Sequence, residues 1–312
     1  MARKILVTGG AGYIGSLMVA EFLSRGYQVT VLDNFMYKQV SLGHVMAHPN
    51  LNLVNGDVRD ESLMKAQLKN ADIIVPLAAL VGAPLCKKDP VGAETINLHA
   101  PLKMLQLASS SQQILMPTTN SAYGNGGGDG FCDEKSTLNP MSLYAQHKVE
   151  VEKVLMEREN SISFRLATVF GISPRMRLDL LVNDFVYRAH NDRFIVLFES
   201  HFRRNYVHVR DVISAFLLGI EDFNRMKGQV YNVGLSEANM TKMELCLAIK
   251  KLVPNFTIME AAIGEDPDKR DYIVSNAKLE KTGWRAEHNL EKGIKELLKG
   301  YQMIRNSVYS NV

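Results

Sequence analysis

The sequence predicts a doubly wound α/β fold, in which helices cover both faces of a parallel sheet, followed by a smaller α/β domain. Through the first half of the chain, short apolar runs alternate with longer stretches whose apolar residues recur at helical spacing. The short runs are continuously apolar, which is typical of strands buried on both faces of a parallel sheet. Strands that alternate with helices in this way indicate a doubly wound fold.

The individual elements of the first half follow from this pattern. The predicted strands are Ile5–Thr8, Gln28–Leu32, Leu51–Asn55, Asp72–Val75, Gln113–Met116 and Ser161–Leu166. The predicted helices are Tyr13–Ser24, Glu61–Leu68, Pro101–Ala108 and Ser142–Glu157. Each predicted strand is shorter than the helices beside it, as expected for a compact α/β domain.

The rhythm changes after Phe170, where Gly171–Arg175 forms a predicted turn. The helices predicted beyond it are Leu178–Ala189, Thr241–Leu252 and Leu290–Met303, with short strands between them. We therefore expect residues 1–170 to form the first domain. Residues 171–312 then form a smaller substrate-binding domain, with some chain crossing back to the first.

Two local signals refine this outline. Thr241 precedes an apolar periodic run and Glu244 follows three residues later, which predicts a capping box at the start of that helix. The cluster Gly124–Gly130 is rich in glycine and lies inside the first domain. It predicts a surface or lid loop.

The composition excludes several classes of protein. A net charge of +3 with dispersed basic residues does not indicate a nucleic-acid surface. Three widely spaced cysteines fit neither a disulfide framework nor a zinc site, and eight scattered histidines suggest no metal centre. No signal peptide or membrane span is apparent in the sequence. We expect a cytoplasmic protein with no metal and with neither a membrane nor a nucleic acid as its partner.

A glycine-rich turn follows the first predicted strand. Gly9, Gly12 and Gly15 lie between that strand and the first predicted helix. In a dinucleotide-binding turn, the first glycine permits the tight turn, the second lets the backbone approach a pyrophosphate, and the third allows close helix packing. The unpaired N–H groups of the helix then face the phosphates. The spacing predicts the Rossmann form of the doubly wound fold.

Asp33 ends the second predicted strand, about twenty residues after the glycines. A carboxylate at this position accepts hydrogen bonds from the ribose hydroxyls of the adenosine and repels a 2′-phosphate. No arginine follows it immediately. The expected cofactor is therefore NAD and not NADP.

Tyr144 and Lys148 lie four residues apart in a predicted helix, so they share one face of it. In a chain with 11 tyrosines such a spacing also arises by chance, and alone it indicates only a surface tyrosine beside a lysine stem. The order of the parts makes it informative. A glycine turn, an acidic strand end and then this pair after the fifth predicted strand indicate a dehydrogenase.

Together these parts resemble the extended short-chain dehydrogenase/reductase family, in particular its NAD-dependent nucleotide-sugar epimerases and dehydratases, over nearly the whole chain. The resemblance implies cofactor contacts from Gly9, Gly12, Tyr13, Ile14, Gly15, Asp33, Asn34, Asp57, Val58, Leu77, Ala78, Ala79 and Asn97, together with Tyr144 and Lys148. It implies that Thr119, Tyr144 and Lys148 are catalytic. It implies substrate contacts from Val81, Asn120, Ser121, Asn183, Arg204 and Arg270.

The resemblance also implies a mechanism. Lys148 and the positive nicotinamide ring lower the pKa of Tyr144, which takes the proton of a sugar hydroxyl. Thr119 hydrogen-bonds the same oxygen, and the carbon-bound hydrogen leaves as hydride to NAD, most directly from C4 of the sugar. Arg204 and Arg270 pair with the diphosphate of the substrate.

Departures from the family pattern narrow the expected reaction. The 4,6-dehydratases have an Asp-Glu pair after the catalytic threonine, whereas this chain has Asn120 and Ser121, which supply no acid and base for eliminating water. The 3,5-epimerase/4-reductases have a cysteine where this chain has Ser121. Both activities are therefore disfavoured.

The segment Val81–Cys86 is unusual for a 4-epimerase. Together with the stretch from Phe164 to Phe185 it looks most like an NAD-dependent 4-dehydrogenase acting on a GDP-linked manno-heptose in bacterial capsule synthesis. The main alternative is a nucleotide-sugar 4-epimerase of the UDP-glucose/galactose type, with no net redox change. A non-catalytic dinucleotide-binding regulator is a second alternative, disfavoured by the Tyr144/Lys148 pair. We expect a GDP-linked substrate in preference to a UDP-linked one.

The helix that carries Tyr144 has an apolar stripe, Val149, Val151, Val154 and Leu155, which suits either the core or a subunit interface. In the family this helix pairs with the preceding long helix across a two-fold axis. The resemblance therefore implies a homodimer or a dimer of dimers.

Overall fold

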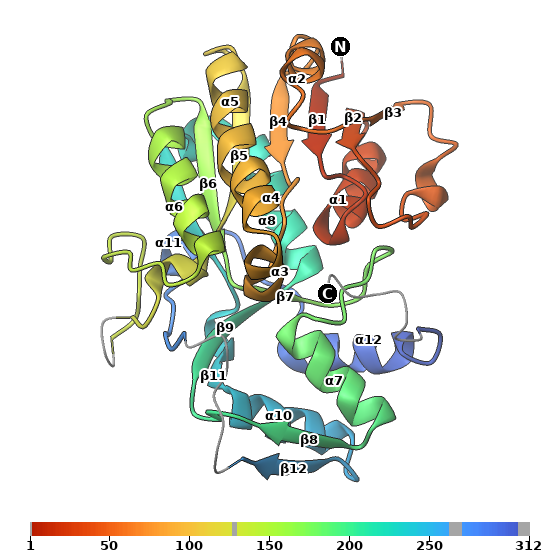
Figure 1. The fold of residues 1–312 in the computed structure, drawn as a ribbon, viewed down its shortest axis with the longest axis vertical. Coiled ribbons are helices and arrows are strands. Elements are labelled where there is room, and N and C mark those ends of the chain that lie inside the picture. Colours follow the sequence, from red (N-terminus) through yellow and green to blue (C-terminus); the bar gives the residue numbers. More distant parts are fainter. Residues whose placement is uncertain (1, 127–129, 262–269, 305–312) are drawn as a thin grey trace.

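The computed structural model describes residues 2–126, 130–261 and 270–304. Its largest sheet has seven strands in the order β10-β6-β5-β4-β1-β2-β3, and every neighbouring pair is parallel. The strand order reverses between β1 and β4, as in a Rossmann fold. The predicted doubly wound parallel sheet is confirmed (Figure 1).

Six of the seven strands of this sheet begin at or next to the predicted positions, and the seventh, Gln229–Val233, falls where the sequence predicts short strands without bounds. The strands are β1 (Lys4–Thr8), β2 (Gln28–Asp33), β3 (Leu51–Asn55), β4 (Ile73–Pro76), β5 (Gln113–Thr119), β6 (Ser161–Leu166) and β10 (Gln229–Val233). The largest difference is in β5, which runs three residues beyond the predicted end because Pro117–Thr119 pair with Phe164–Leu166 of β6. This extension carries Thr119 to the carboxyl edge of the sheet.

Helices cover both faces of the sheet. On one face lie α1 (Tyr13–Ser24) and α8 (Val209–Glu221), which contact each other. On the other lie α2 (Glu61–Leu68), α5 (Ala100–Leu107) and α6 (Leu143–Leu155), whose buried side chains form a second core with the sheet. Successive strand residues point to opposite faces of the sheet. Val7 packs in the core on the α1 and α8 side, and Leu6 packs in the core on the α2, α5 and α6 side.

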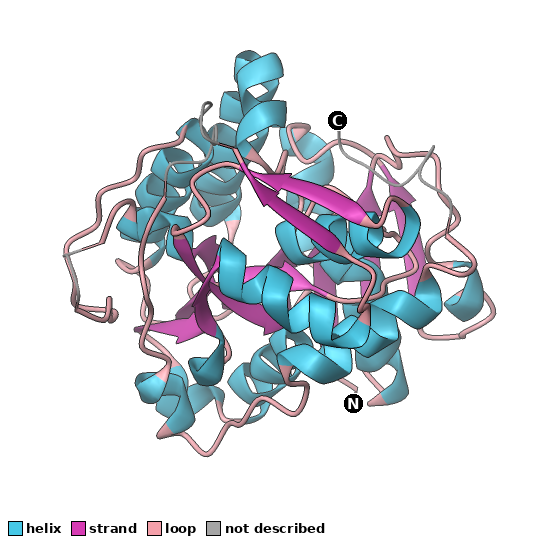
Figure 2. Cartoon of the chain, turned by 90° about the horizontal axis from the view of Figure 1, so that it is seen from below, coloured by secondary structure: helices cyan, strands magenta, loops and turns pink. Residues whose placement is uncertain are grey.

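Part of the chain beyond residue 170 completes this sheet. Helix α8 packs on α1, and β10 pairs with β6 at the sheet edge. The remaining elements lie below the carboxyl edge of the sheet (Figures 1 and 2). They include β7 (Thr168–Phe170), α7 (Leu181–Asn191), β8 (Phe194–Leu197), β9 (Arg203–His208), β11 (Asn239–Thr241), α10 (Lys242–Leu252), β12 (Thr257–Glu260) and α12 (Leu290–Gly300). Strands β8 and β12 pair in parallel, and β9 lies between β7 and β11.

The short helices are α3 (Ala83–Lys88), α4 (Pro90–Glu94), α9 (Phe223–Met226) and α11 (Ala277–Glu280). At the start of α10 the capping box is confirmed: the Thr241 hydroxyl accepts from the Glu244 N–H, and the Glu244 carboxylate accepts from the Thr241 N–H. The predicted loop at Gly124–Gly130 includes residues 127–129, which lie outside the described residues. Within the described residues, no helix has the length and apolarity needed to cross a membrane.

One predicted helix starts later than expected. The sequence predicts a helix from Leu178, but α7 begins at Leu181 because Leu180 is extended, with φ −76° and ψ 135°. The preceding residues Arg177 and Asp179 form an ion pair with each other. The difference matters because the segment between β7 and α7 forms one wall of a cavity of about 1110 Å³.

Candidate active site

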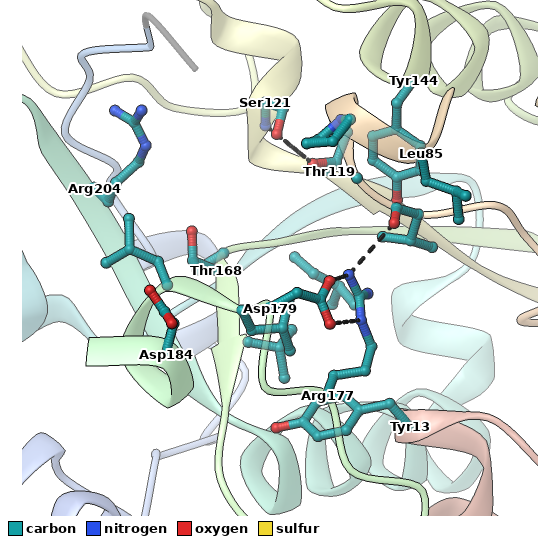
Figure 3. A pocket seen from close by; sticks show the side chains of 18 of the residues that line it. Tyr13, Leu85, Thr119, Ser121, Tyr144, Thr168, Arg177, Asp179, Asp184 and Arg204 are labelled. Carbon is teal, nitrogen blue, oxygen red and sulfur yellow. Dashed lines mark hydrogen bonds and ion pairs between the residues drawn. The ribbon is translucent and has the colours of Figure 1, made fainter. Parts of the chain in front are cut away.

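A cavity of about 1110 Å³ opens between the sheet and the elements below it (Figure 3). Its wall includes the glycine turn after β1, the start of α6, the segment between β7 and α7, and strand β8. A smaller cavity of about 100 Å³ adjoins it around the end of β2. Both lie at the carboxyl edge of the parallel strands near the reversal of strand order, where doubly wound folds bind ligands.

The glycine turn leaves no room for side chains. Gly9 has a φ of +70°, and a Cβ there would lie 2.6 Å from the Ala78 nitrogen. A Cβ on Gly15 would lie 2.5 Å from the Gly9 carbonyl oxygen. Gly12 stands at the N-cap of α1 and provides no side-chain cap. The turn therefore presents bare backbone and a helix N-terminus to the cavity, which suits a pyrophosphate.

Asp33 ends β2 beside this turn. Its carboxylate accepts hydrogen bonds from the Ala11 N–H at 3.0 Å and from the Phe35 N–H at 2.8 Å. Burial raises the pKa of Asp33, and these two donors oppose the rise. Each carboxylate oxygen can accept more than one hydrogen bond, so the Asp33 carboxylate can still accept hydrogen bonds from the two hydroxyls of a ribose.

The smaller cavity brings together many of the predicted cofactor contacts. Its lining includes Asp33, Asn34, Asp57, Val58, Leu77, Ala78 and Ala79. Tyr13, Ile14 and Gly15 line the larger cavity, which Gly9, Gly12, Leu77 and Ala79 also border. The residues present thus fit a dinucleotide that spans the two cavities.

Three catalytic candidates meet in the larger cavity. Thr119, Tyr144 and Lys148 all line it. The Lys148 Nζ donates to the Pro117 carbonyl oxygen at 3.3 Å and lies 6.0 Å from the centre of the Tyr144 ring. Burial raises the pKa of Tyr144 to about 12 and lowers the pKa of Lys148 to about 8. Perturbed groups that share a cleft are typical of an active site.

Thr119 is held at the end of β5 by its neighbour. Its hydroxyl donates to the Ser121 Oγ at 3.0 Å and accepts from the Ser121 N–H at 3.1 Å. Ser121 also accepts a hydrogen bond from the Arg270 Nη1. Ser121 and Arg270 both line the cavity. Arg270, a predicted diphosphate contact, is therefore linked through Ser121 to the catalytic candidate Thr119.

Arg204 reaches the cavity from β9 and is 1% exposed. Its Nη1 donates to the Arg203 carbonyl oxygen at 2.9 Å, and its guanidinium lies 5.8 Å from the centre of the Tyr272 ring. Val81, another predicted substrate contact, also lines the cavity. Thus four of the six predicted substrate residues, Val81, Ser121, Arg204 and Arg270, border the same space.

Three predicted contact residues do not line either of the two cavities. Asn97 lies in a π-helical turn, where its amide bonds the N–H and the carbonyl of Leu80 at 2.8 Å each. Asn183 accepts from the Gly171 N–H and donates to the Arg177 carbonyl and to the Tyr13 hydroxyl. Both amides therefore brace the cavity wall, and their contacts to the cofactor and the substrate stay predictions.

Asn120 is the third, and it is fully buried. Within the described residues, neither of its amide atoms has a hydrogen-bond partner. Its side chain does not border the cavity that Thr119 and Ser121 line.

Sequence reasoning missed four polar residues of the cavity wall. Arg177 and Asp179 pair with each other, and the Arg175 guanidinium stacks 3.8 Å above the centre of the Tyr37 ring. Arg175 and Tyr37 border both cavities, so they stand where the two join. The two arginines are apparent in the sequence just after the turn, but nothing in the pattern indicates that they face inward.

The chain is similar to proteins of known function. The sequence pattern of the NAD dependent epimerase/dehydratase family matches residues 5–234. UDP-glucuronic acid decarboxylase 1 of Arabidopsis thaliana is 27% identical over 96% of this chain and 70% of its own length. UDP-glucose 4-epimerase of Thermotoga maritima, solved with UDP-glucose, is 25% identical, with a TM-score of 0.85 over 96% of this chain and 98% of that one.

A third relative was solved with its cofactor. The dTDP-glucose 4,6-dehydratase DesIV of Streptomyces venezuelae, bound to NAD, is 25% identical, with a TM-score of 0.83 over 96% of this chain and 97% of that one. The glycine turn and Asp33 fit this cofactor, and NAD is the cofactor of the chain. The chain is an enzyme that belongs to the NAD-dependent epimerase/dehydratase family.

Proposed function

We propose that this enzyme oxidises the C4 hydroxyl of a nucleotide sugar with NAD and yields a 4-keto sugar and NADH. One observation carries the proposal: Thr119, Tyr144 and Lys148 line the cavity that the dinucleotide turn also borders. Asn120 and Ser121 stand where a dehydratase needs an acid and a base. The site therefore has the groups for removing a hydroxyl proton and lacks those for eliminating water.

Each catalytic side chain has a separate part in this step. The Tyr144 oxygen takes the proton of the sugar hydroxyl, and the Thr119 hydroxyl hydrogen-bonds the oxygen that loses it. Lys148, fixed by the Pro117 carbonyl oxygen, favours the anionic form of Tyr144 through its positive charge. NAD, when bound, accepts the hydride from the sugar carbon.

The rest of the substrate occupies the lower part of the cavity. Arg204 and Arg270 are the proposed partners of the diphosphate, since arginine pairs with phosphate through charge-assisted hydrogen bonds. The Arg270 contact to Ser121 links this region to the catalytic threonine. We propose a GDP-linked manno-heptose, or a related hexose, as the substrate in the synthesis of capsule polysaccharide. We propose a cytoplasmic location for this chemistry, and all three cysteines are buried.

A 4-epimerase is the second candidate. Its support is the likeness to the Thermotoga maritima UDP-glucose 4-epimerase, whose sequence identity to this chain equals that of the dehydratase DesIV. An epimerase returns the hydride to the opposite face of the sugar, so it leaves no NADH.

A direct assay separates the two candidates. Purified enzyme is incubated with NAD and with GDP-manno-heptose, GDP-mannose or UDP-glucose, while NADH absorbance and the configuration at C4 are followed. A dehydrogenase produces NADH and a 4-keto sugar in equal amounts. Inversion at C4 without either product would establish the epimerase and reject our proposal.

A further inference from the structure

Arg177 and Asp179 form an ion pair in the wall of the larger cavity, in the segment between β7 and α7. Their side chains are only 10% and 17% exposed. The Arg177 Nε donates to the Asp179 Oδ1 at 3.3 Å, and the Arg177 Nη2 donates to the Asp179 Oδ2. Nη2 also donates to the Val81 carbonyl oxygen at 3.3 Å. Figure 3 shows the pair on the same side of the cavity as Tyr144.

These bonds leave one end of the guanidinium available. Within the described residues, the Arg177 Nη1 makes no hydrogen bond, although Nε and Nη2 are both engaged. Nη1 is also not among the buried polar atoms that lack a partner. Because Arg177 lines the cavity, its two Nη1 hydrogens are open to a molecule bound there.

The pair lies near the reacting end of the cavity. Burial is the main influence on the pKa of Tyr144, and the charge of Arg177 comes next, ahead of Cys86 and Arg270. Val81, which Arg177 bonds, follows the Leu77–Ala79 turn that borders the dinucleotide site. Arg177 therefore lies at the Tyr144 end of the cavity, where the sugar hydroxyl is proposed to react.

We propose that Arg177 is a specificity-determining residue that donates from Nη1 to a sugar hydroxyl near the reacting carbon, and that Asp179 neutralises it so that the site prefers an uncharged sugar to a uronic acid. This inference rests on the proposed oxidation of a nucleotide sugar. It names the class of sugar, a neutral polyhydroxylated one.

The physical basis is the charge already present in the wall. A hydroxyl accepts from Nη1 without adding charge, so it is compatible with the ion pair. A sugar carboxylate at the same place meets an arginine already paired with one carboxylate, and it lies close to the negative charge of Asp179. In a site shielded from water, such like-charge contact costs affinity. Two other cations of the cavity are engaged elsewhere: Arg175 stacks on Tyr37, and Lys148 bonds the Pro117 carbonyl.

The comparison with relatives makes this a sharp distinction. UDP-glucuronic acid decarboxylase 1 is named for an acidic sugar, yet it is 27% identical to this chain over 96% of this chain. In this chain, the proposed preference for a neutral sugar over an acidic one depends on the negative charge of Asp179.

The experiment measures binding to the NADH-loaded enzyme, which cannot oxidise the sugar, by calorimetry, with GDP-mannose and GDP-mannuronic acid as probes that differ only at C6. The wild-type enzyme should bind the neutral sugar more tightly. Asp179→Asn removes the charge and keeps the shape, so it should lower the ratio of neutral to acidic affinity by about tenfold. Arg177→Met should weaken binding of the neutral sugar by about fivefold and leave NAD affinity unchanged.

Asp184→Asn is the matched control, because Asp184 also lines the cavity and pairs with Arg188 at 2.9 Å. It should leave the affinity ratio unchanged. Equal or tighter binding of GDP-mannuronic acid by the wild-type enzyme would overturn the inference without any variant. An unchanged ratio in Asp179→Asn, with thermal melting and NAD affinity intact, would do the same.

Binding is read without turnover, so the two proposals fail separately. If the affinity ratio shifts as expected but no NADH forms with either sugar, the oxidation proposal fails and the assignment of Arg177 and Asp179 holds. If NADH forms but the ratio does not respond to Asp179, only the inference fails.

Discussion

At the scale of single residues, burial opposes the charged forms of two catalytic candidates, Tyr144 and Lys148. Burial raises the pKa of Tyr144 to about 12 and lowers the pKa of Lys148 to about 8. Each shift disfavours the charged form that the proposed chemistry uses. At neutral pH the buried Lys148 ammonium costs folding stability, whereas Tyr144 is neutral in both the folded and the unfolded state and carries no such cost.

Tyr144→Phe tests the proton acceptor. The ring and its packing are kept while the oxygen is lost, so turnover should fall by about 10²- to 10⁴-fold while NAD affinity stays the same. Steady-state NADH formation and calorimetric NAD binding measure the two quantities. Turnover within a factor of about two of wild type would remove Tyr144 from the mechanism.

Lys148→Met tests the cost of the buried charge in the cofactor-free protein. The folded pKa of about 8 lies below the ordinary value of 10.5, so the unfolded state binds more protons between these pH values and stability rises with pH there. Below about pH 8 the folded state carries the full penalty, roughly 3 kcal/mol. The variant should therefore melt at a higher temperature than wild type at pH 7, and this advantage should shrink towards pH 10.

The control for that measurement is Lys153→Met, an exposed lysine on the same helix. Its melting temperature should follow wild type across the same pH range. A Lys148→Met protein that is no more stable than wild type at pH 7 would show that the buried ammonium carries no such penalty.

These residues differ in how far the sequence alone predicts them. Gly9, Asp33, Tyr144 and Lys148 occupy positions fixed by spacing along one strand, turn or helix, so the local pattern is enough to locate them. No local sequence pattern predicts Arg177, because its role depends on the ion pair with Asp179 and on an irregular segment that folds towards the cavity. Tertiary contacts of this kind leave no periodic trace in a sequence.

At the scale of elements, helix α6 is tied to the sheet by a buried polar network. The Glu152 carboxylate pairs with the Arg165 guanidinium at 2.5 Å, and both side chains are 6% exposed. It also accepts hydrogen bonds from the hydroxyls of Thr118 at 2.8 Å and Ser163 at 2.6 Å. Since Tyr144 and Lys148 lie on the same helix, this network sets their position relative to Thr119.

Glu152→Gln tests how much this network contributes to the free energy of folding. It leaves the Arg165 charge buried without its counter-charge, which costs about 3–5 kcal/mol of folding free energy. Chemical denaturation measures the loss, and Glu150→Gln, an exposed position on the same helix, is the control expected to change stability little. A loss no larger than that of the control would show that Arg165 does not depend on Glu152.

Helix boundaries show where element-scale prediction stops. The predicted first turn of α10 is confirmed, since its capping box is a local signal within four residues. The predicted start of α7 is three residues early, because an apolar periodicity continues through Leu178 and Leu180 although the backbone there is extended. Local caps can be recognised in a sequence, whereas the extended backbone at Leu180, after which α7 begins, leaves no such signal.

At the scale of the whole molecule, the oligomeric state stays a prediction. The apolar stripe of α6 that suggests an interface is partly used inside the protomer, because Val151 and Leu155 are fully buried in the core against the sheet. An interface through α5 and α6 must therefore use the outward side chains of these helices. We expect a homodimer by sedimentation at micromolar concentration, and a monomer under these conditions would contradict it.

The architecture itself explains why both ligands meet. The dinucleotide turn follows β1 at the centre of the large sheet, while Arg204 comes from β9 and Arg270 from the chain beyond β12. The predicted domain boundary near residue 170 marks where the regular alternation of strands and helices ends in the sequence. Beyond it, α8 and β10 nevertheless return to the large sheet. Such a return has no local signal, since α8 and β10 look like any other helix and strand.

The proposed net reaction, NAD-dependent oxidation at C4, can be tested with a single end-point measurement. The enzyme, NAD and GDP-manno-heptose are incubated together, and NADH and the 4-keto sugar are quantified at the end of the reaction. Our account predicts that both form in equal amounts. Recovery of a sugar inverted at C4, with neither NADH nor keto sugar, would contradict it.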